Sequence, residues 1–350
     1  MRTGESTGAK VSDETGVSAR AGVETGVLAA AKGPAASGED VLVVAHATAA
    51  NLGPGFDCLG LALSPANRVR LRFRDGADHV RVEGHGAGVI PTGPENLLVR
   101  SARVLARQAG ADLPGLEVEA DNGVPLGRGL GSSAAAVVCG LVGVRALCGL
   151  DVSDEDLLGL ACRIEGHADN AGACLYGGVT LTFEWEGAWR VRNLEAEAIV
   201  PIPVVSPGAY ETAASRSLLA DSLPRTDAVF NVARAALLVV ALSGDPEDLL
   251  AATEDRLHEP ARLADMPDTA RLRRALRDRG IAAALSGSGP SLVVLASAVD
   301  FESTRRCVEE IVAETASDWR VMPEGFGSAA SARRIPRLDW EGGRGDIQPH

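Results

Sequence analysis

The sequence predicts two α+β domains joined near residue 200. Its 350 residues are enough for two domains of ordinary size, each with its own core. Segments with strand-like and helix-like patterns follow one another without the regular βαβ alternation of a doubly wound parallel sheet. The character of the sequence also changes between Pro201 and Pro207, which puts the junction there.

The first domain is expected over residues 41–200. It begins at Val41 with the strand-like "VLVVAHATAA", and a period of two predicts further strands in "RVRLRFR", "HVRVEG" and "GLEVEA". Helical spacing predicts a helix over 96–110, and a run of small residues predicts a second over Ser132–Cys148. Ser153 is expected to cap a third helix, and the strand-like "GGVTLTFEW" follows it.

The second domain is expected over residues 201–330. Apolar spacing predicts helices over 228–244 and 268–280. The stretch 281–296, "IAAALSGSGPSLVVLA", has the pattern of a hairpin, and a last helix is predicted at about 300–316.

We expect a tail at each end of this folded region. Residues 1–40 are rich in Gly, Ala, Ser, Thr and Glu, and the phrase Glu-Thr-Gly-Val at 14–17 recurs at 24–27. Two copies without an apolar face are too little for a repeat fold, so this segment is predicted to be a disordered tail. Residues 331–350 are predicted to form a second, flexible tail.

The charge of the chain argues against some classes of partner. The formal net charge is −13 and the arginines are scattered, whereas nucleic acids and anionic membranes select clustered Lys and Arg. The sequence lacks a secretion signal and an uninterrupted apolar run of membrane-spanning length. We therefore expect a cytoplasmic protein without a nucleic-acid or membrane partner. Reduced thiols are expected at the cysteines, which lack metal-ligand spacing: Cys58, Cys139, Cys148, Cys162, Cys174 and Cys307.

A glycine-rich stretch, "VPLGRGLGSSAA" at 124–135, is the strongest local sign of a binding site. A Walker A loop requires a lysine before its Ser or Thr, and none is present. The Rossmann pattern GxGxxA fits Gly129 to Ala134, with Asp151 following 20 residues after Gly131, but it requires a strand that runs directly into the first glycine. Here "LEVEA" ends nine residues before Gly129. A protein-kinase glycine loop connects two strands, whereas a helix is predicted to follow this one.

What remains is a helix N-terminus preceded by glycines. Glycine permits positive φ and a close approach of the main chain, and the free N–H groups at the start of a helix attract anions. The hydroxyls of Ser132 and Ser133 add donors, or one ligand for Mg²⁺ bound together with phosphates. These residues favour a phosphate site, with a tight structural turn as the alternative.

Three motifs, in this order, resemble those of the GHMP kinase superfamily: "ATAANLGPGFDCLGLAL", "PLGRGLGSSAA" and "ALSGSGPSLVVLA". The resemblance covers roughly residues 41–330. Within the superfamily, "NLGPGFDCLGLAL", "EGHADN" and "DRLHEPAR" are similar to the homoserine kinase family. The resemblance implies a two-domain GHMP kinase fold. Its N-terminal domain is of the ribosomal-protein-S5-domain-2 type with a left-handed βαβ unit, and its C-terminal domain is ferredoxin-like.

The same resemblance implies the reaction. It is the ATP-dependent phosphorylation of the side-chain hydroxyl of L-homoserine to O-phospho-L-homoserine, in threonine biosynthesis, with Mg²⁺ and in a homodimer. Two alternatives stay open. One is a GHMP-type kinase of another small hydroxyl metabolite, and the other is a catalytically inactive nucleotide or metabolite sensor.

The resemblance also assigns nucleotide and metal residues. Ser133 and Glu165 are expected to hold Mg²⁺, a hard ion that takes few protein oxygens and several waters. Without the resemblance, Glu165 is more simply a solvated carboxylate at a helix end. ATP is expected along Pro125, Leu126, Gly127, Arg128, Gly129, Leu130, Gly131, Ser132, Ser133, Ala134 and Ala135.

Substrate residues are implied in the same way. Asn51 and Asp57 are expected to hold the amino acid, with Asp57 against its ammonium group, although the residues alone allow an ordinary Asx turn. A planar guanidinium suits a carboxylate, so Arg216 and Arg262 are expected at the carboxylate of the substrate. The remaining substrate residues are His167, Asn170 and Gly287.

Asn170 determines the kind of catalysis that we expect. It stands where relatives similar to mevalonate kinase carry a catalytic Asp, and an amide does not take a proton at neutral pH. With Asn170, Ser133 and Glu165 as catalytic residues, the enzyme is expected to act by positioning and electrostatic stabilisation, and Asp169 is not assigned as a base. The sequence departs from the family pattern at His46, Ala49, Ala168, Cys174 and Tyr176.

Overall fold

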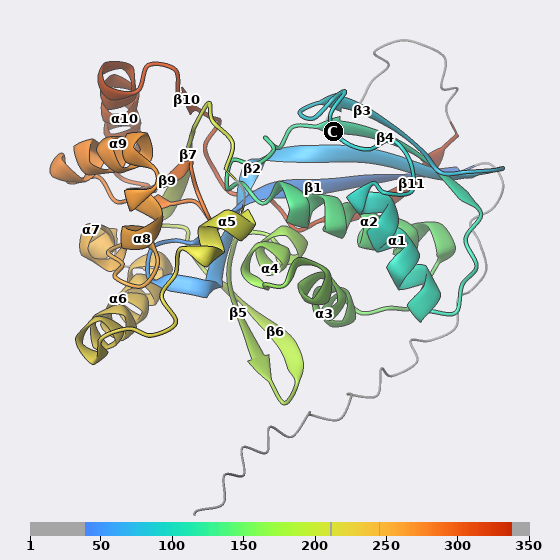
Figure 1. Ribbon diagram of the computed structural model, residues 1–350, viewed down its shortest axis with the longest axis horizontal. Helices are drawn as coiled ribbons and strands as arrows, with labels where there is room; N and C mark the ends of the chain where they lie inside the picture. The colour runs from blue at the N-terminus through green and yellow to red at the C-terminus, as the bar shows by residue number, and fades with distance from the viewer. Residues whose placement is uncertain (1–38, 211, 245, 338–350) are drawn as a thin grey trace, which may run out of the picture.

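The computed structural model describes residues 39–210, 212–244 and 246–337. They form a seven-stranded mixed sheet and a four-stranded antiparallel sheet, with helices packed on both (Figure 1). The predicted α+β class is confirmed. The chain leaves the first sheet after Leu194 and enters the second at Ile199.

Two long antiparallel strands form the centre of the first sheet, β1 (Glu39–Asn51) and β2 (Gly55–Arg74). Their inward residues, such as Val41, Val43 and Leu71, lie in one buried cluster because alternate side chains of a strand share a face. The remaining strands of this part are β3 (His79–Gly84), β4 (Gly115–Asn122), β5 (Val179–Trp185) and β6 (Ala188–Leu194).

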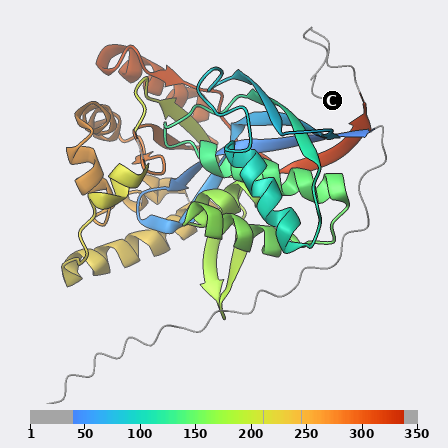
Figure 2. The ribbon, with the colours of Figure 1, turned by 45° about the vertical axis from the view of Figure 1, so that its right-hand side comes forward.

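A parallel pair breaks the antiparallel pattern of the first sheet. β4 lies antiparallel to β2, and β3 lies parallel to β4 at the edge. The connection between β3 and β4 contains the helix α1 (Leu97–Gln108), so the three elements form a βαβ unit. β5 pairs with the first half of β2 and forms a hairpin with β6, which projects from the body of the molecule in Figures 1 and 2.

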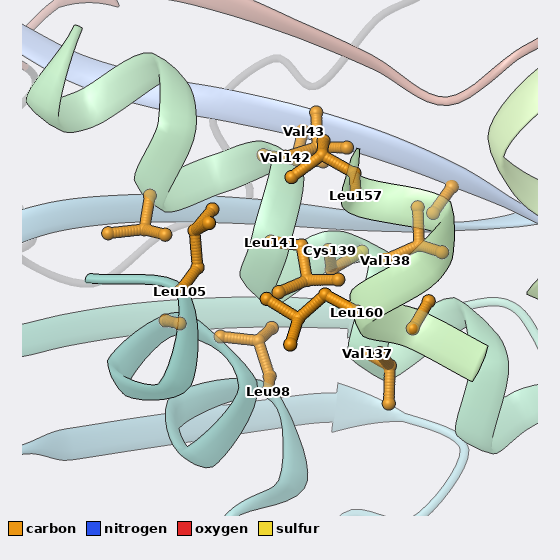
Figure 3. Packing of buried hydrophobic residues seen from close by; sticks show 14 of the residues in the cluster. Val43, Leu98, Leu105, Val137, Val138, Cys139, Leu141, Val142, Leu157 and Leu160 are labelled. Atoms are coloured by element: carbon orange, nitrogen blue, oxygen red, sulfur yellow. The ribbon is translucent and has the colours of Figure 1, made fainter. Parts of the chain in front are cut away.

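One face of this sheet is covered by α1, α2 (Ser132–Cys148), α3 (Asp154–Glu165) and α4 (Asp169–Tyr176) (Figure 1). Most residues of α2 are buried, since it lies between the sheet and its neighbouring helices. Its small side chains allow this close packing. Figure 3 shows Cys139 and Leu141 among Leu98, Leu105 and Leu160. The predicted cap of α3 is present, because Ser153 Oγ accepts a hydrogen bond from the Asp156 N–H at 3.1 Å.

The second sheet has the order β10–β7–β9–β8, and its pairs are antiparallel. Helices α9 (Pro267–Asp278) and α10 (Phe301–Thr315) pack on one face through residues such as Leu272 and Ile311. The strands are β7 (Ile199–Val205), β8 (Ala283–Leu285), β9 (Leu292–Ser297) and β10 (Arg320–Val321). The remaining helices are α5 (Thr212–Ser217), α6 (Arg225–Ser243), η1 (Pro246–Asp248), α7 (Leu249–Ala252) and α8 (Glu259–Ala264).

A second buried cluster joins the two sheets. It contains Leu59 and Leu61 of β2, Leu238 of α6 and Val293 of β9. Because apolar side chains from both sheets share this core, the two parts of the chain are held in a fixed relation. Residues that lie between the two sheets are therefore held in place by contacts with both sheets.

Part of the predicted C-terminal tail is a strand, which corrects the sequence-based prediction for 331–350. Residues Ser331–Pro336 form β11, which lies antiparallel to the first half of β1 and covers its free edge. An ion pair of 3.4 Å between Arg334 and Glu39 adds to the pairing. β1 likewise begins at Glu39, within the predicted 1–40 tail; residues 1–38 and 338–350 lie outside the described part.

Candidate active site

A cavity of about 860 Å³ lies against the glycine-rich loop. Its apolar part comes from β2, β3, β4 and the start of α1, and its polar part comes from α4, α5, α8 and the loops near them. Figure 1 shows β3 and β4 well apart from α5 and α8, so the two parts of the lining differ in chemistry and in place. Every residue expected to bind substrate lines the cavity: Asn51, Asp57, His167, Asn170, Arg216, Arg262 and Gly287.

The glycine-rich loop turns its carbonyl groups toward neighbouring segments. Gly127, Gly129 and Gly131 have φ angles of 60°, 73° and 66°, which L side chains rarely adopt. Four successive carbonyl oxygens, from Gly127 to Leu130, accept hydrogen bonds from outside the loop. The donors, in this order, are Tyr210 N, Ser291 N, Ser286 Oγ and Thr48 N. Since these carbonyl oxygens accept hydrogen bonds from neighbouring segments, they do not point at an anion bound by the N–H groups and do not repel it.

The loop leads directly into α2, whose N-cap is Gly131 without a side-chain cap. The first helical hydrogen bond runs from Ala135 N to Gly131 O at 2.9 Å. The N–H groups of Ser132, Ser133 and Ala134 therefore have no acceptor within the helix. With the positive end of the helix dipole, they make this part of the cavity wall a candidate anion site. A Rossmann turn is excluded by this context, because the loop does not follow a strand directly.

Ser133 and Glu165 meet beside this anion site. The Ser133 hydroxyl donates a hydrogen bond of 2.6 Å to Glu165 Oε2, although the residues are 32 positions apart. Burial raises the pKa of Glu165 above its ordinary value, while the bond from Ser133 opposes the shift. The two oxygens are hard ligands, and a cation between them and a phosphate would relieve the desolvation of the carboxylate. Among the described residues, no group of three or more His, Cys, Asp and Glu could hold a metal ion.

The strand ends on both sides of the turn between β1 and β2 are strained where they reach the cavity. Asn51 and Asp57 have φ angles of 70° and 57°, in the left-handed region that non-glycine residues rarely occupy. The Asn51 amide holds the turn, since its Nδ2 donates to Gly287 O at 2.9 Å and its Oδ1 accepts from Asp57 N at 3.0 Å. The first motif and the C-terminal glycine motif are thus tied together by one side chain.

Two arginines lie at this polar end. Arg216 of α5 forms an ion pair of 2.6 Å with Asp57, and both side chains are partly exposed, at 40% and 37%. Arg262 of α8 is 2% exposed, and its Nη1 donates to Gly287 O at 3.1 Å. Burial lowers the pKa of Arg262, and the charge of Arg216 adds to this shift. Both guanidinium groups also lie near the ring of Phe56, at 5.7 Å and 5.4 Å from its centroid.

A buried carboxylate organises the start of α4. Asp169 is 2% exposed, and its Oδ1 accepts from Asn170 N at 2.7 Å and lies 3.1 Å from His167 Nδ1. The hydrogen bond with Asp169 raises the pKa of His167, although burial opposes the shift. The Asn170 amide is held from the other side, because Thr48 Oγ1 donates to its Oδ1 at 2.7 Å.

Sequence reasoning missed three positioning residues, namely Thr48, Asp169 and Ser286. Each contacts an expected site residue, and each lies within or beside a recognised motif, but nothing in the sequence states which neighbour a side chain faces. The apolar lining was also missed, because its members are spread over three strands and a helix. These residues include Val69, Val80, Val82, Leu97 and Leu98.

The five departures from the family pattern do not line the cavity. His46, for example, donates from Nδ1 to Leu63 O and Ser64 O, at 3.0 Å and 3.1 Å, and so belongs to the β1–β2 pairing. Ala49, Ala168 and Cys174 are buried in the surrounding structure. The unusual residues therefore lie behind the site and not at its surface.

Comparison with known proteins gives the family. The models for the GHMP kinases N terminal domain and the GHMP kinases C terminal match residues 96–178 and 233–313. The homoserine kinase of Clavibacter michiganensis subsp. michiganensis is 43% identical over 288 residues, which cover 81% of this chain and 90% of the relative. That of Streptomyces coelicolor is 45% identical over 270 residues, covering 76% and 87%.

Solved structures agree with this result. The homoserine kinase from Cytophaga hutchinsonii superimposes with a TM-score of 0.72 at 28% identity, over 85% of this chain and 97% of that one. The L. major mevalonate kinase in complex with R-mevalonate gives a TM-score of 0.63 at 16% identity, over 86% and 99%. The second similarity supports the fold alone.

Proposed function

The chain belongs to the homoserine kinase family of the GHMP kinases, and from this premise we propose how its cavity carries out the reaction. The activity is the ATP-dependent phosphorylation of the side-chain hydroxyl of L-homoserine, in threonine biosynthesis. The observation that carries the proposal is the meeting of an anion site with a polar pocket in one cavity.

ATP occupies the loop and the apolar part of the cavity. The triphosphate lies along Gly127 to Ser133, where free N–H groups and the dipole of α2 neutralise its charge. The nucleobase enters the apolar part, where Val80, Val82 and Leu98 supply dispersion contacts for a flat ring. The phosphate to be transferred then faces the polar residues.

Ser133 and Glu165 would hold Mg²⁺ at the phosphates of ATP. Their oxygens already share one hydrogen bond, so only a small displacement separates this pair from a pair of metal ligands. When bound, the ion supplies charge neutralisation at the phosphates during transfer. Glu165 is suited to it because burial makes its ionised form costly without a cation.

Homoserine binds at the polar end as a zwitterion. Asp57 accepts hydrogen bonds from the ammonium group, and Arg216 and Arg262 donate hydrogen bonds to the carboxylate. The ion pair between Asp57 and Arg216 satisfies both charges before substrate arrives, and homoserine replaces it with one opposite charge for each partner. This exchange keeps both side chains paired in either state.

The reacting hydroxyl lies near Asn170. Its amide is fixed by Thr48 and by Asp169, so it orients the hydroxyl toward the transferred phosphate. An amide does not take a proton, and no step is assigned to a carboxylate base. The rate then comes from alignment and from the stabilisation of charge at the loop, as phosphoryl transfer mainly requires.

We further infer a homodimer that pairs α6 with its copy. Val229, Val232 and Val240 of α6 are 63%, 71% and 58% exposed, with exposed Ala233 and Ala236 on the same stripe. A twofold axis near Ala236 brings Val232 of one copy against Val240 of the other, because each lies four residues from it. Among the described helices, α6 is also the one long and apolar enough to cross a membrane.

The dimer is tested by measuring molar mass with light scattering. The wild-type chain is expected at twice its monomer mass, and Val232→Glu at the monomer mass, since a charge placed against the apolar Val240 of the other copy opposes association. A monomeric wild-type chain contradicts the pairing. Partition of the wild-type chain into vesicles assigns the α6 stripe to a membrane and contradicts the expected cytoplasmic location.

The reaction is tested by coupled ADP release with L-homoserine, mevalonate and galactose side by side. Turnover with homoserine and its loss on chelation of Mg²⁺ are expected. Turnover with another alcohol, but not with homoserine, would agree with a GHMP kinase and would contradict homoserine as the substrate. ATP binding without turnover of any of them would support the inactive sensor.

A further inference from the structure

His258 lies directly behind Arg262 and has no role in the reaction described above. It is 0% exposed at the N-cap of α8, four residues before Arg262. We infer that His258 is a positioning residue that orients the Arg262 guanidinium toward the substrate carboxylate. In this way it makes the enzyme select substrates that carry a carboxylate. This inference rests on the proposed role of Arg262 in binding that carboxylate.

The hydrogen bonds fix the state of the imidazole. Arg262 Nη1 lies 3.0 Å from His258 Nδ1, and an arginine nitrogen can only donate. Nδ1 must therefore accept, so it carries no proton. The proton is on Nε2, which donates to the carbonyl oxygen of Gly53 at 2.8 Å. His258 is thus a neutral ring with one acceptor, aimed at Arg262.

This contact determines which edge of the guanidinium is free. The two hydrogens of Nη1 are used, one toward His258 Nδ1 and one toward Gly287 O at 3.1 Å. Among the described residues, Nε is buried without a partner. The edge formed by Nε and Nη2 remains, and two parallel N–H groups on one edge match the two oxygens of a carboxylate. Arg262 lines the cavity, and the proposal places the substrate carboxylate at this edge.

His258 itself is held from three sides. The Gly53 carbonyl to which it donates belongs to the turn between β1 and β2, the turn that also carries Asn51 and Asp57. Asp255 Oδ2 accepts from His258 N at 2.8 Å and fixes the start of α8. The ring of Phe56 lies 5.1 Å from the imidazole, between centroids. His258 therefore links the turn that holds the ammonium group to the arginine that holds the carboxylate.

Substitutions can separate the two hydrogen bonds. In His258→Asn the amide oxygen can take the place of Nδ1 and still accept from Arg262. In His258→Gln the amide nitrogen can take the place of Nε2, which keeps the bond to Gly53 and loses the acceptor. His258→Phe keeps an aromatic ring against Phe56 and loses both bonds.

The measurement is steady-state kinetics of the full-length enzyme with ATP and Mg²⁺. We expect KM for homoserine to rise about 10- to 100-fold in His258→Phe and His258→Gln, with KM for ATP unchanged. His258→Asn should stay within about 3-fold of wild type. His79→Gln, at an exposed histidine outside the cavity, is the matched control. Melting temperatures show whether each variant is folded.

An analogue without a carboxylate separates positioning from a structural role. For 3-aminopropan-1-ol, which keeps the amine and the hydroxyl, the substitutions at His258 should change kcat/KM by less than about 2-fold, because Arg262 has no carboxylate to bind. Equal losses for homoserine and for this analogue overturn the inference.

The underlying assignment is tested by Arg262→Gln. An unchanged KM for homoserine in Arg262→Gln refutes the proposed role of Arg262 and this inference with it. A raised KM in Arg262→Gln with an unchanged KM in His258→Phe overturns the inference alone.

Discussion

The Ser133 hydroxyl donates a 2.6 Å hydrogen bond to Glu165 Oε2, which joins the first turn of α2 to the last residue of α3. One partner lies at the candidate anion site and the other is a half-buried carboxylate with a raised pKa. The bond explains how a residue at an ordinary helix end becomes part of the site. In the proposed function, the two residues therefore act together.

Removing either member of this pair should lower kcat by about 100-fold, because the charge of the transferred phosphate loses its stabilisation. The variants are Ser133→Ala and Glu165→Gln, and ADP release is measured over a range of Mg²⁺ concentrations. The double variant should be no worse than about 3-fold below the single ones, since the residues act together. Ser303→Ala, on α10, is the control, and wild-type kcat in Ser133→Ala at every Mg²⁺ concentration would refute the metal assignment.

The ion pair between Asp57 and Arg216 predicts a selective effect on homoserine binding. Asp57→Asn and Arg216→Gln should each raise KM for homoserine about 10- to 100-fold, because each removes one charged hydrogen bond to the zwitterion. KM for ATP should change by less than about 3-fold. The exposed ion pair of Arg81 and Glu83 offers the control Arg81→Gln. Equal changes in both KM values would mean that the pair supports the fold and not the substrate.

Asn170→Asp tests whether a carboxylate at position 170 can act as a general base. A second carboxylate would stand next to Asp169 Oδ1, which now lies 3.3 Å from Asn170 Nδ2. The repulsion of like charges should displace the side chain and lower kcat at least about 10-fold at pH 7. An increase in kcat would show that a carboxylate at this position can act as a base, and would contradict catalysis by positioning alone.

Gly131→Ala tests the close approach at the end of the loop. A Cβ there would overlap the Thr48 hydroxyl that holds Asn170, and the φ of 66° adds strain. We expect KM for ATP to rise and kcat to fall, each by about 10-fold or more. Gly110→Ala is a matched control, with a φ of 68° and no atom within 4 Å of the new Cβ. If Gly131→Ala keeps wild-type kinetics, as Gly110→Ala is expected to do, then activity depends neither on the close approach of Thr48 to Gly131 nor on the positive φ of Gly131.

Asp78 should make stability depend on pH. Burial alone would raise its pKa, but hydrogen bonds from Arg103 and from Leu116 N outweigh burial, and the pKa is lowered. A carboxyl with a lowered pKa stabilises the folded state above its ordinary pKa of 3.8, and this contribution is lost as the pH falls below that value. Asp78→Asn should therefore lower the free energy of unfolding by about 2 kcal/mol at pH 7.

Urea unfolding at pH 7, 5 and 3 measures this effect. The difference between Asp78→Asn and wild type should be constant from pH 7 to pH 5 and smaller at pH 3. Glu83→Gln, in an exposed ion pair, should cost less than about 0.5 kcal/mol at every pH. A difference that grows as the pH falls would have the wrong sign for a lowered pKa.

The sequence by itself determined the local structure and the family. Period-two and helical patterns located strands such as "RVRLRFR" and the helix over Ser132–Cys148, because alternation and spacing are local properties of the chain. Three motifs in order were enough to predict the reaction, and the absence of a lysine was enough to exclude a Walker A loop. Glycines with positive φ were also readable, since few other residues adopt that conformation.

The tertiary structure decided which distant residues meet. The sequence contains no signal that Ser286 would bond to Gly129, 157 positions away, or that His258 would stand behind Arg262 against the carbonyl of Gly53. Ser331–Pro336 resembled a tail because its partner is the edge of β1, almost 300 residues earlier. Such pairings depend on how the two sheets pack around a shared core, and packing is a property of the whole chain and not of any segment.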